Sequence, residues 1–233
     1  AVCRDLLQHA NGFGVPRDTS LSGWFNTKTG ELFSGFPIHQ HDVVLDVGCG
    51  DSPFSGFCAQ QGAAVMFTDI DVGKVRATRQ ALTAVRDKKS SPFVSDGSHL
   101  PLKNESVDKI ISLEVLEHVD DPAAYVSELA RVGRAGACYL ITVPDPAIEK
   151  LQRKGLAPDV YFSKPNHIHI WEHEAFAKLV GNAGLDIEHT ARFGFYWSMW
   201  WVFFWACRQE LAPPWHPLLK SWTATWSTLL ATE

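Results

Sequence analysis

VVLDVGCGDSPF, residues 43–54, carries the strongest signal for the fold. An apolar run ends at two glycines, and Pro53 follows at a place that suits the first turn of a helix. Glycine adopts positive φ and lets a backbone come close to a ligand. The stretch therefore predicts a strand, a tight turn and a helix capped by Ser52. On this motif alone, a turn without a ligand stays open as the alternative.

The rest of the chain alternates strand patterns with helix patterns. Helices are predicted at 72–87, 121–136 and 172–184, and strands at 42–47, 63–69, 91–96, 107–115, 137–144 and 185–190. Strands that are apolar on both faces are typical of a parallel sheet covered by helices on both sides. The prediction is an α/β fold.

Composition and charge narrow the classes of protein. A length of 233 residues suits one domain, 1–233, which we divide into an irregular N-terminal cap (1–40), a core (41–190) and an aromatic C-terminal segment (191–233). The net charge is −5 and no basic run is present, so no nucleic-acid partner is expected. The scattered cysteines show no CxxC spacing, which favours a reducing, cytoplasmic compartment: Cys3, Cys49, Cys58, Cys138 and Cys207. No signal peptide is recognisable, and a chain that begins Ala1-Val2 is expected to be a fragment or a trimmed chain.

Acidic residues stand at the ends of successive predicted strands. Asp69 ends the second strand, 19 residues after Gly50, and Asp96-Gly97 ends the third. Ligands bind at the carboxyl ends of such strands, where a carboxylate can accept hydrogen bonds from both ribose hydroxyls. Pro53 stands where a dinucleotide fingerprint needs its third glycine, and no phosphate-binding lysine follows. The pattern favours a nucleoside ligand without phosphate.

Several motifs together resemble the class I S-adenosylmethionine-dependent methyltransferases, in the broad subgroup that includes the quinone-pathway enzymes. They are VLDVGCG, TDID, SDGSHLPLKNESVDKIISLEVLEHVDDP, YLITVP and HIHIWEHEAFAKLVGNAGLDI, and they cover roughly residues 40–190. The resemblance implies a Rossmann-like, doubly wound, mostly parallel sheet of six or seven strands with helices on both faces. The family often has a glycine where this chain has Ser52.

The resemblance also implies a set of residues around the cofactor S-adenosyl-L-methionine. They are Asp46, Gly48 and Gly50 at the methionine part, Asp69 with the adjacent Ile70 at the ribose, Asp96 and Gly97 at the adenine, and Leu113 and Glu114 below the sulfonium.

The implied reaction is transfer of a methyl group to a small-molecule acceptor by in-line displacement, for which the protein supplies alignment and excludes water. A hydroxyl oxygen of a sugar, a phenol or quinone precursor, or a lipid-linked group is the favoured acceptor, and it needs a base or a metal to remove its proton. The predicted catalytic residues are His167, His118 and Glu114, with His169 also near the expected mouth. An N-methyltransferase, a non-catalytic cofactor-binding module and a nicotinamide oxidoreductase stay open as alternatives.

The pattern Glu114-x-x-Glu117-His118, followed by His167, resembles the ExxEH…H arrangement of two related groups. These are the ubiquinone-pathway O-methyltransferases and the small-RNA 3′-terminal 2′-O-methyltransferases. The resemblance implies a divalent cation such as Mg²⁺, held by Glu114, Glu117, His118 and His167. In the alternative without a metal, Glu117 and His118 begin a helix and His167 acts as the base.

Three segments are expected around the acceptor. The long connection 144–165 is predicted to cover it, with Tyr161, Phe162 and Lys164 facing it. Residues 1–40 are expected to form another wall, with Trp24 and Phe25 at its edge. The third is the segment that carries seven of the nine tryptophans between residues 197 and 226, including the 15-residue run 193–207. It is interpreted as a core helix or strand, as a wall for an apolar acceptor, or as a membrane-interface element with weak surface association.

Overall fold

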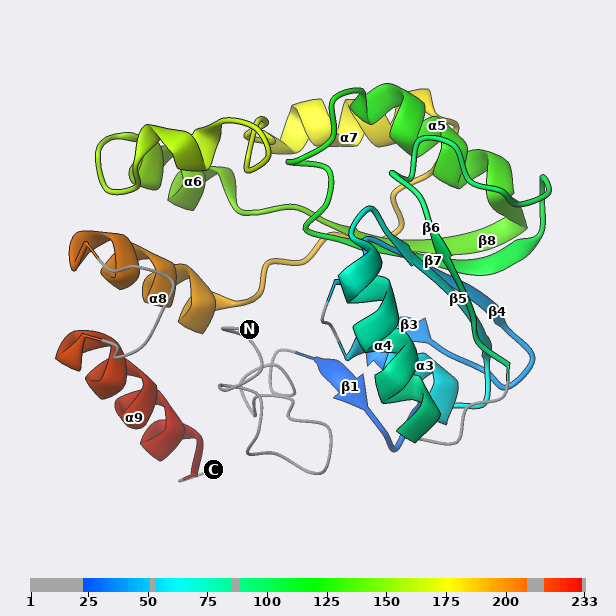
Figure 1. Cartoon of the computed structure of the whole chain (residues 1–233), viewed down its shortest axis with the longest axis horizontal. Helices are drawn as coiled ribbons and strands as arrows, with labels where there is room; N and C mark the ends of the chain where they lie inside the picture. Colours follow the sequence, from blue (N-terminus) through cyan, green and yellow to red (C-terminus); the bar gives the residue numbers. More distant parts are fainter. Residues whose placement is uncertain (1–22, 51–52, 85–88, 209–215, 232–233) are drawn as a thin grey trace.

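A five-stranded parallel sheet forms the centre of the computed structural model, which describes residues 23–50, 53–84, 89–208 and 216–231 (Figure 1). The strand order is β6-β5-β4-β7-β8, so the chain starts in the middle, moves to one edge and returns to build the other. The strands are β4 (Val43–Val47), β5 (Ala64–Asp69), β6 (Ser91–Val94), β7 (Val107–Leu113) and β8 (Gly133–Thr142). This order confirms the doubly wound α/β prediction.

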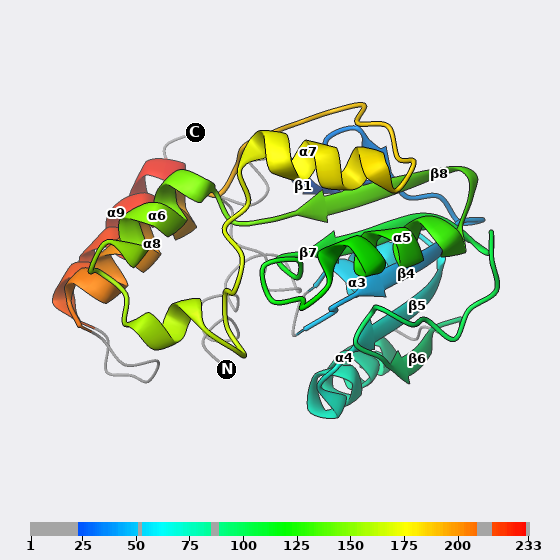
Figure 2. The ribbon, with the colours of Figure 1, turned by 90° about the horizontal axis from the view of Figure 1, so that it is seen from above.

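Helices cover both faces of this sheet, as predicted (Figure 2). One face carries α3 (Phe54–Gln60) and α4 (Val72–Ala84), and the other carries α5 (Pro122–Val132) and α7 (His173–Asn182). A hydrophobic core lies on each face of the sheet, and alternate residues of the strands belong to one or the other. Val44 and Phe67 pack on the α3 side, while Leu45 and Val47 pack on the α5 side. Both cores exclude water from the sheet, which is why its strands read as continuous apolar runs.

The strand count differs from the predicted six or seven. Residues 185–190, predicted as a strand, form no regular element, and β8 is the last strand of the described chain. The predicted helix 121–136 ends at Val132 because Gly133 turns to an extended conformation and begins β8. The start of that helix agrees with the prediction, since Pro122 lies in its first turn and Asp121 caps it by accepting a hydrogen bond from the Ala124 amide.

The prediction of an irregular cap is wrong for residues 24–37. They form an antiparallel sheet of β1 (Trp24–Asn26), β2 (Glu31–Phe33) and β3 (Phe36–Pro37). Trp24 is only 2% exposed and packs on Phe33, Phe54 and Phe193. The pattern was missed because these strands are two or three residues long, too short for a periodicity to show. Residues 1–22 and Ser52 lie outside the described chain.

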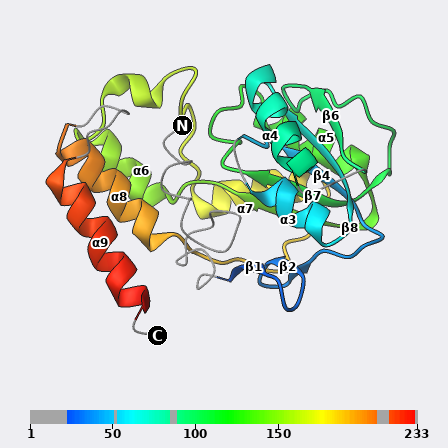
Figure 3. The ribbon, with the colours of Figure 1, turned by 60° about the horizontal axis from the view of Figure 1, so that its bottom comes forward.

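A second helical layer stands beside the sheet, with α6, α8 and α9 side by side in Figure 3. It comprises α6 (Pro146–Arg153), the 3₁₀ turn η1 (Asp159–Phe162), α8 (Phe195–Ala206) and α9 (Pro217–Ala231), and we call it the aromatic lobe. Its core holds Tyr196, Trp200, Phe204 and Leu219. The aromatic run is therefore a helix of a small core rather than a strand of the main sheet.

Among the described helices, none is both long enough and apolar enough to cross a membrane.

Candidate active site

The glycine turn after β4 lies at the carboxyl edge of the sheet. The amides of Gly48 and Cys49 both donate to the Thr68 carbonyl at 2.9 Å, which ties the turn to β5. Gly48 has φ of +77°, and a Cβ added there would lie 2.4 Å from Cγ2 of Val115. The loop after β7 thus packs directly on this turn, so glycine is needed for protein packing as well as for access to a ligand.

Asp46 sits in β4 below this turn and is 3% exposed. Its carboxylate accepts a hydrogen bond of 2.6 Å from the Ser55 hydroxyl on α3. Burial, which disfavours the charged form, raises the pKa of Asp46 from 3.8 to about 6. A cationic group brought to this edge would stabilise the ionised carboxylate.

Asp69 ends β5 and is also buried, with 6% exposed. Its two carboxylate oxygens accept hydrogen bonds from the amides of Gly50 at 3.0 Å and of Asp71 at 2.9 Å. This holds the side chain against the glycine turn. Each carboxylate oxygen has a second lone pair, so both can still accept from a hydroxyl.

The Asp96-Gly97 turn follows β6 at the next strand end. The Asp96 carboxylate accepts from the Ser98 amide at 2.9 Å, and Gly97 packs so tightly that an added Cβ would lie 2.3 Å from the Tyr125 ring. Ile70, Val72 and Val94 lie at the same edge and are 75%, 48% and 52% exposed. Exposed aliphatic side chains beside a carboxylate are suited to hold a flat heterocycle such as adenine.

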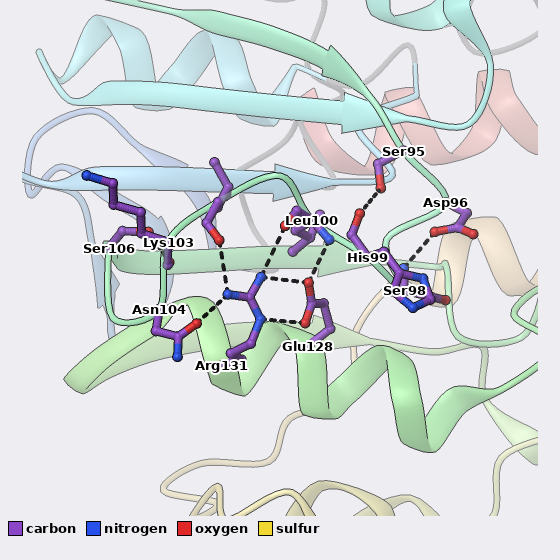
Figure 4. Close-up of polar contacts among 11 residues, drawn as sticks. Ser95, Asp96, Ser98, His99, Leu100, Lys103, Asn104, Ser106, Glu128 and Arg131 are labelled. Atoms are coloured by element: carbon purple, nitrogen blue, oxygen red, sulfur yellow. Dashed lines mark hydrogen bonds and ion pairs between the residues drawn. The ribbon is translucent and has the colours of Figure 1, made fainter.

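Arg131 of α5 holds the segment that follows this turn (Figure 4). Its guanidinium donates to both Glu128 carboxylate oxygens at 2.7 Å, to the carbonyls of Leu100 and Leu102, and to the Asn104 side chain. The hydrogen bonds from Arg131 lower the pKa of Glu128. Sequence reasoning missed this pair, although an acidic and a basic residue three apart on a predicted helix are a usable signal.

Glu114 follows β7 with φ of +55°, a left-handed conformation that is uncommon for a residue with a side chain. Its carboxylate accepts from the Thr142 hydroxyl at 2.8 Å. Part of the side chain is exposed, but protein surrounds it closely enough that desolvation raises its pKa. Strain of this kind gathers at functional sites. The preceding residue, Leu113, is half-buried and pairs with Thr142 in β8.

Glu117, His118 and His167 come together just beyond Glu114, with one ligand atom of each within 4.8 Å of the others. Glu117 is 1% exposed, and neither of its carboxylate oxygens has a hydrogen-bond partner. Burial, with a contribution from the Glu114 carboxylate, raises the pKa of Glu117 well above its usual value. Leaving a carboxylate without a partner in a protein interior is costly, so this position is suited to a cation.

Each of the two histidines beside this carboxylate also has a hydrogen-bond partner for one ring nitrogen. Nδ1 of His118 is 2.9 Å from the Asn166 carbonyl, which can only accept, so the proton is on Nδ1 and the Nε2 lone pair is left. Nε2 of His118 lies 3.7 Å from Oε1 of Glu117. Nδ1 of His167 lies 2.9 Å from Oε2 of Glu149. One buried carboxylate and two imidazoles form a donor set that fits a divalent cation.

Glu114 is not a member of this group of three, and its carboxylate accepts a hydrogen bond from Thr142. Glu149 was not foreseen. It lies on α6, inside the long connection that was expected to cover the acceptor, and no local pattern marked it.

The other predicted residues are spread over different roles. Tyr161 lies over His167 with ring centroids 4.5 Å apart, while Phe162 packs on Tyr161 and Arg153. Lys164 forms an exposed ion pair with Asp120, and His169 binds the Val119 carbonyl at 2.8 Å. Trp24 is core, and Phe25 stacks on Phe54.

Comparisons with known proteins match the core of this chain to methyltransferases. Residues 45–141 match the family model described as a methyltransferase domain. An uncharacterized methyltransferase from Mycobacteroides abscessus is 32% identical over 100 residues, which are 43% of this chain and 39% of that protein. The chain thus spans about two fifths of that relative's length.

Two further comparisons extend beyond the matched domain. A ubiquinone biosynthesis O-methyltransferase from Pseudoalteromonas translucida is 27% identical over 180 residues, 71% of this chain and 72% of that protein. The crystal structure of a SAM-dependent methyltransferase from Aquifex aeolicus superposes with a TM-score of 0.60 at 16% identity, covering 82% of this chain and 91% of that one. The structural likeness concerns the fold.

Proposed function

We propose that this chain transfers a methyl group from S-adenosylmethionine to a hydroxyl oxygen of a small-molecule acceptor. The match of residues 45–141 to a methyltransferase domain and the likeness to a ubiquinone biosynthesis O-methyltransferase support this proposal. The observation that carries the choice of oxygen is the buried, unpartnered Glu117 beside His118 and His167. Such a group serves to activate a hydroxyl, and an amine acceptor would not require it. The relative from Pseudoalteromonas translucida, an O-methyltransferase by name, supports this choice.

The chain's own residues hold the methyl donor at the carboxyl edge of the sheet. Asp69 accepts hydrogen bonds from the ribose hydroxyls, and Ile70, Val94 and the Asp96-Gly97 turn hold the adenine. The Gly48–Gly50 turn and Asp46 bind the methionine part, where the donor's ammonium group offsets the cost of the buried Asp46 carboxylate. Leu113 and Glu114 lie next to the reacting sulfonium.

The acceptor lies over Glu117, His118 and His167. A divalent cation bound there would lower the pKa of the acceptor hydroxyl and orient it. In the displacement the acceptor oxygen bonds to the methyl carbon, the sulfur–methyl bond breaks, and the hydroxyl proton passes to a base. With the cation bound, the hydroxyl loses its proton to solvent before the attack, and in the alternative without a cation the Nε2 lone pair of His167 would take it. Tyr161 and the long connection limit the access of water as a competing acceptor.

Tyr161 and Trp205 point to the class of acceptor. Tyr161 lies 4.5 Å from His167 and 5.1 Å from Trp205 of α8, by ring centroids, so the aromatic lobe reaches the site. Desolvation raises the pKa of Tyr161, which keeps its phenol neutral. We infer an aromatic or otherwise apolar acceptor, such as a phenol, that packs on this wall.

The proposal is tested by metal removal and return. Purified protein with S-adenosylmethionine and a panel of phenols should lose turnover in a chelator and regain it with Mg²⁺ or a transition ion. Glu117→Gln should lose turnover but keep its affinity for S-adenosylhomocysteine, which calorimetry measures. Full turnover in chelator would contradict the metal and leave His167 as a base without one, while transfer only to amines would contradict the hydroxyl acceptor.

A cofactor-binding module without catalysis would bind S-adenosylhomocysteine and turn over no acceptor, and an oxidoreductase would bind NAD instead. We also propose a cytoplasmic location with weak membrane-surface association. The described cysteines, Cys49, Cys58, Cys138 and Cys207, are free thiols, which supports a reducing compartment.

A further inference from the structure

Glu149 is a buried carboxylate that the proposed chemistry does not use. Its side chain is 3% exposed and lies 2.9 Å from Nδ1 of His167, whose side chain is 14% exposed. The adjacent Lys150 points elsewhere and pairs with Glu172 at the surface. Burying a carboxylate costs free energy, and its contact with one imidazole does not by itself offset that cost. Its position therefore requires an explanation beyond holding α6 in place.

The helix that carries Glu149, α6, is held by a cap at its N-terminus and by packing against a neighbouring helix. Asp145 caps α6 by accepting a hydrogen bond from the Ala147 amide at 2.8 Å, and Pro146 occupies the first turn. α6 also packs against α8 of the aromatic lobe. Glu149 thus stands on a rigid element, while His167 stands on a loop.

The contact decides which nitrogen of His167 is available. A carboxylate only accepts, so the proton of the neutral imidazole is held on Nδ1 and the lone pair is left on Nε2. Tyr161, at 4.5 Å and 35°, and His118, at 4.8 Å and 89°, restrict the plane of the ring. His118 has the same arrangement through the Asn166 carbonyl, so both imidazoles present Nε2.

We propose that Glu149 is a positioning residue that fixes the tautomer and orientation of His167, so that Nε2 serves the bound cation or the acceptor hydroxyl. The inference rests on the proposed function for its consequence, but the tautomer itself is a property of the protein alone. Carboxylates or carbonyls behind a ligating imidazole are a general means of raising its basicity, and their loss lowers metal affinity or activity about 10–100-fold. The aromatic lobe, by holding α6, thereby contributes to the site.

The first test reads the tautomer directly in cofactor-free protein. Long-range ¹H–¹⁵N correlation spectra of ¹⁵N-histidine protein, at a pH where imidazoles are neutral, distinguish Nδ1–H from Nε2–H. His167→Gln identifies the His167 signals by their loss. Wild type should show Nδ1–H, Glu149→Leu should shift His167 to Nε2–H, and His118 should stay unchanged. An Nε2–H tautomer in wild type, or an unchanged His167 tautomer in Glu149→Leu, would overturn the proposal.

The second test reads the consequence, with Glu172→Gln as the matched control because it removes a carboxylate from the exposed pair with Lys150. Calorimetric titration with Co²⁺ should show affinity falling about 10-fold or more in Glu149→Leu and less in Glu149→Gln, whose amide oxygen can still accept from Nδ1. The turnover number should fall in the same order, with S-adenosylhomocysteine affinity and the control unchanged. Suppose instead that Glu149→Gln and Glu149→Leu lose Co²⁺ affinity and turnover equally, in proportion to their fall in melting temperature. Glu149 would then have a structural role only.

The two tests separate this proposal from the proposed function. If wild type binds no cation and methylates no hydroxyl acceptor, the proposed function fails, and the tautomer spectra still decide the role of Glu149. If Glu149→Leu does not fold, Glu149→Met, which is close in size to glutamate and has no strong acceptor for the Nδ1 proton, supplies the comparison.

Discussion

At the scale of single residues, Asp46 links stability to pH. Its pKa is about 6 in the folded chain and 3.8 as an ordinary carboxyl, so the folded state binds more protons between these values. The stability of the cofactor-free protein should therefore fall as pH rises from about 4 through 6 and then level, by roughly 3 kcal/mol at about 1.4 kcal/mol per pKa unit.

Asp46→Asn removes this dependence because an amide does not titrate, and its oxygen can still accept the hydrogen bond from Ser55. Urea unfolding across this pH range should show the variant gaining stability relative to wild type as pH rises. A difference that stays constant with pH would contradict the shifted pKa. The same variant should bind S-adenosylhomocysteine less tightly.

Asp69→Asn should weaken binding of S-adenosylhomocysteine by about 1.5–3 kcal/mol, because a charged acceptor for the ribose hydroxyls is lost. Asp71→Asn is the matched control, as an asparagine there can still cap the Gly73 amide. Calorimetry measures both. An unchanged dissociation constant in Asp69→Asn would remove Asp69 from the cofactor site.

Gly48→Ala tests whether packing against Val115 or cofactor volume requires the glycine. The added Cβ would meet Val115 at 2.4 Å, so melting temperature and cofactor affinity should both fall. Adding Val115→Ala should restore part of the stability, while the left-handed backbone still costs about 1–2 kcal/mol. A double variant no better than the single one would show that Val115 is not the obstacle.

At the scale of elements, α5 holds the segment that follows the Asp96-Gly97 turn. Arg131→Lys loses the fork that bonds both oxygens of Glu128 and the Leu100 and Leu102 carbonyls. We expect a lower melting temperature and a several-fold weaker affinity for S-adenosylhomocysteine. Arg134→Lys, at an exposed pair with Asp108, is the control and should change little. Equal behaviour of the two variants would mean that Arg131 does not support the cofactor turn.

At the scale of the whole molecule, the aromatic lobe leaves part of its apolar surface uncovered. Phe195 is 61% exposed and lies against Trp222 and Trp226, and Leu218 is 41% exposed next to the exposed Lys220. Aromatic side chains with a nearby cation favour the interface of an anionic bilayer. The protein should co-sediment weakly with phosphatidylserine-containing vesicles, and Phe195→Ser should reduce this. Equal sedimentation of wild type and Phe195→Ser would show that this patch does not bind the vesicles.

Local patterns along the chain are enough to predict the sheet and which residues lie at its carboxyl edge. The strand–turn–helix at residues 43–54, the all-apolar strands and the acidic strand ends are such patterns, and parallel strands bring their carboxyl ends to one edge whatever the loops do. The amino-acid sequence alone therefore predicts that Asp46, Gly48, Asp69 and Gly97 lie at that edge. Glu117, His118 and His167 could be grouped only through the family resemblance.

The remaining features depend on long-range packing. The run 193–207 is apolar on every side, so it has no period that separates a helix from a strand, and the packing of α8 between α6 and α9 settles it. Glu149 and His167 are 18 residues apart with no pattern between them. Their contact, and the separation of Glu114 from the three clustered residues, depend on how a long connection folds back over the sheet, because only packing brings such distant side chains together.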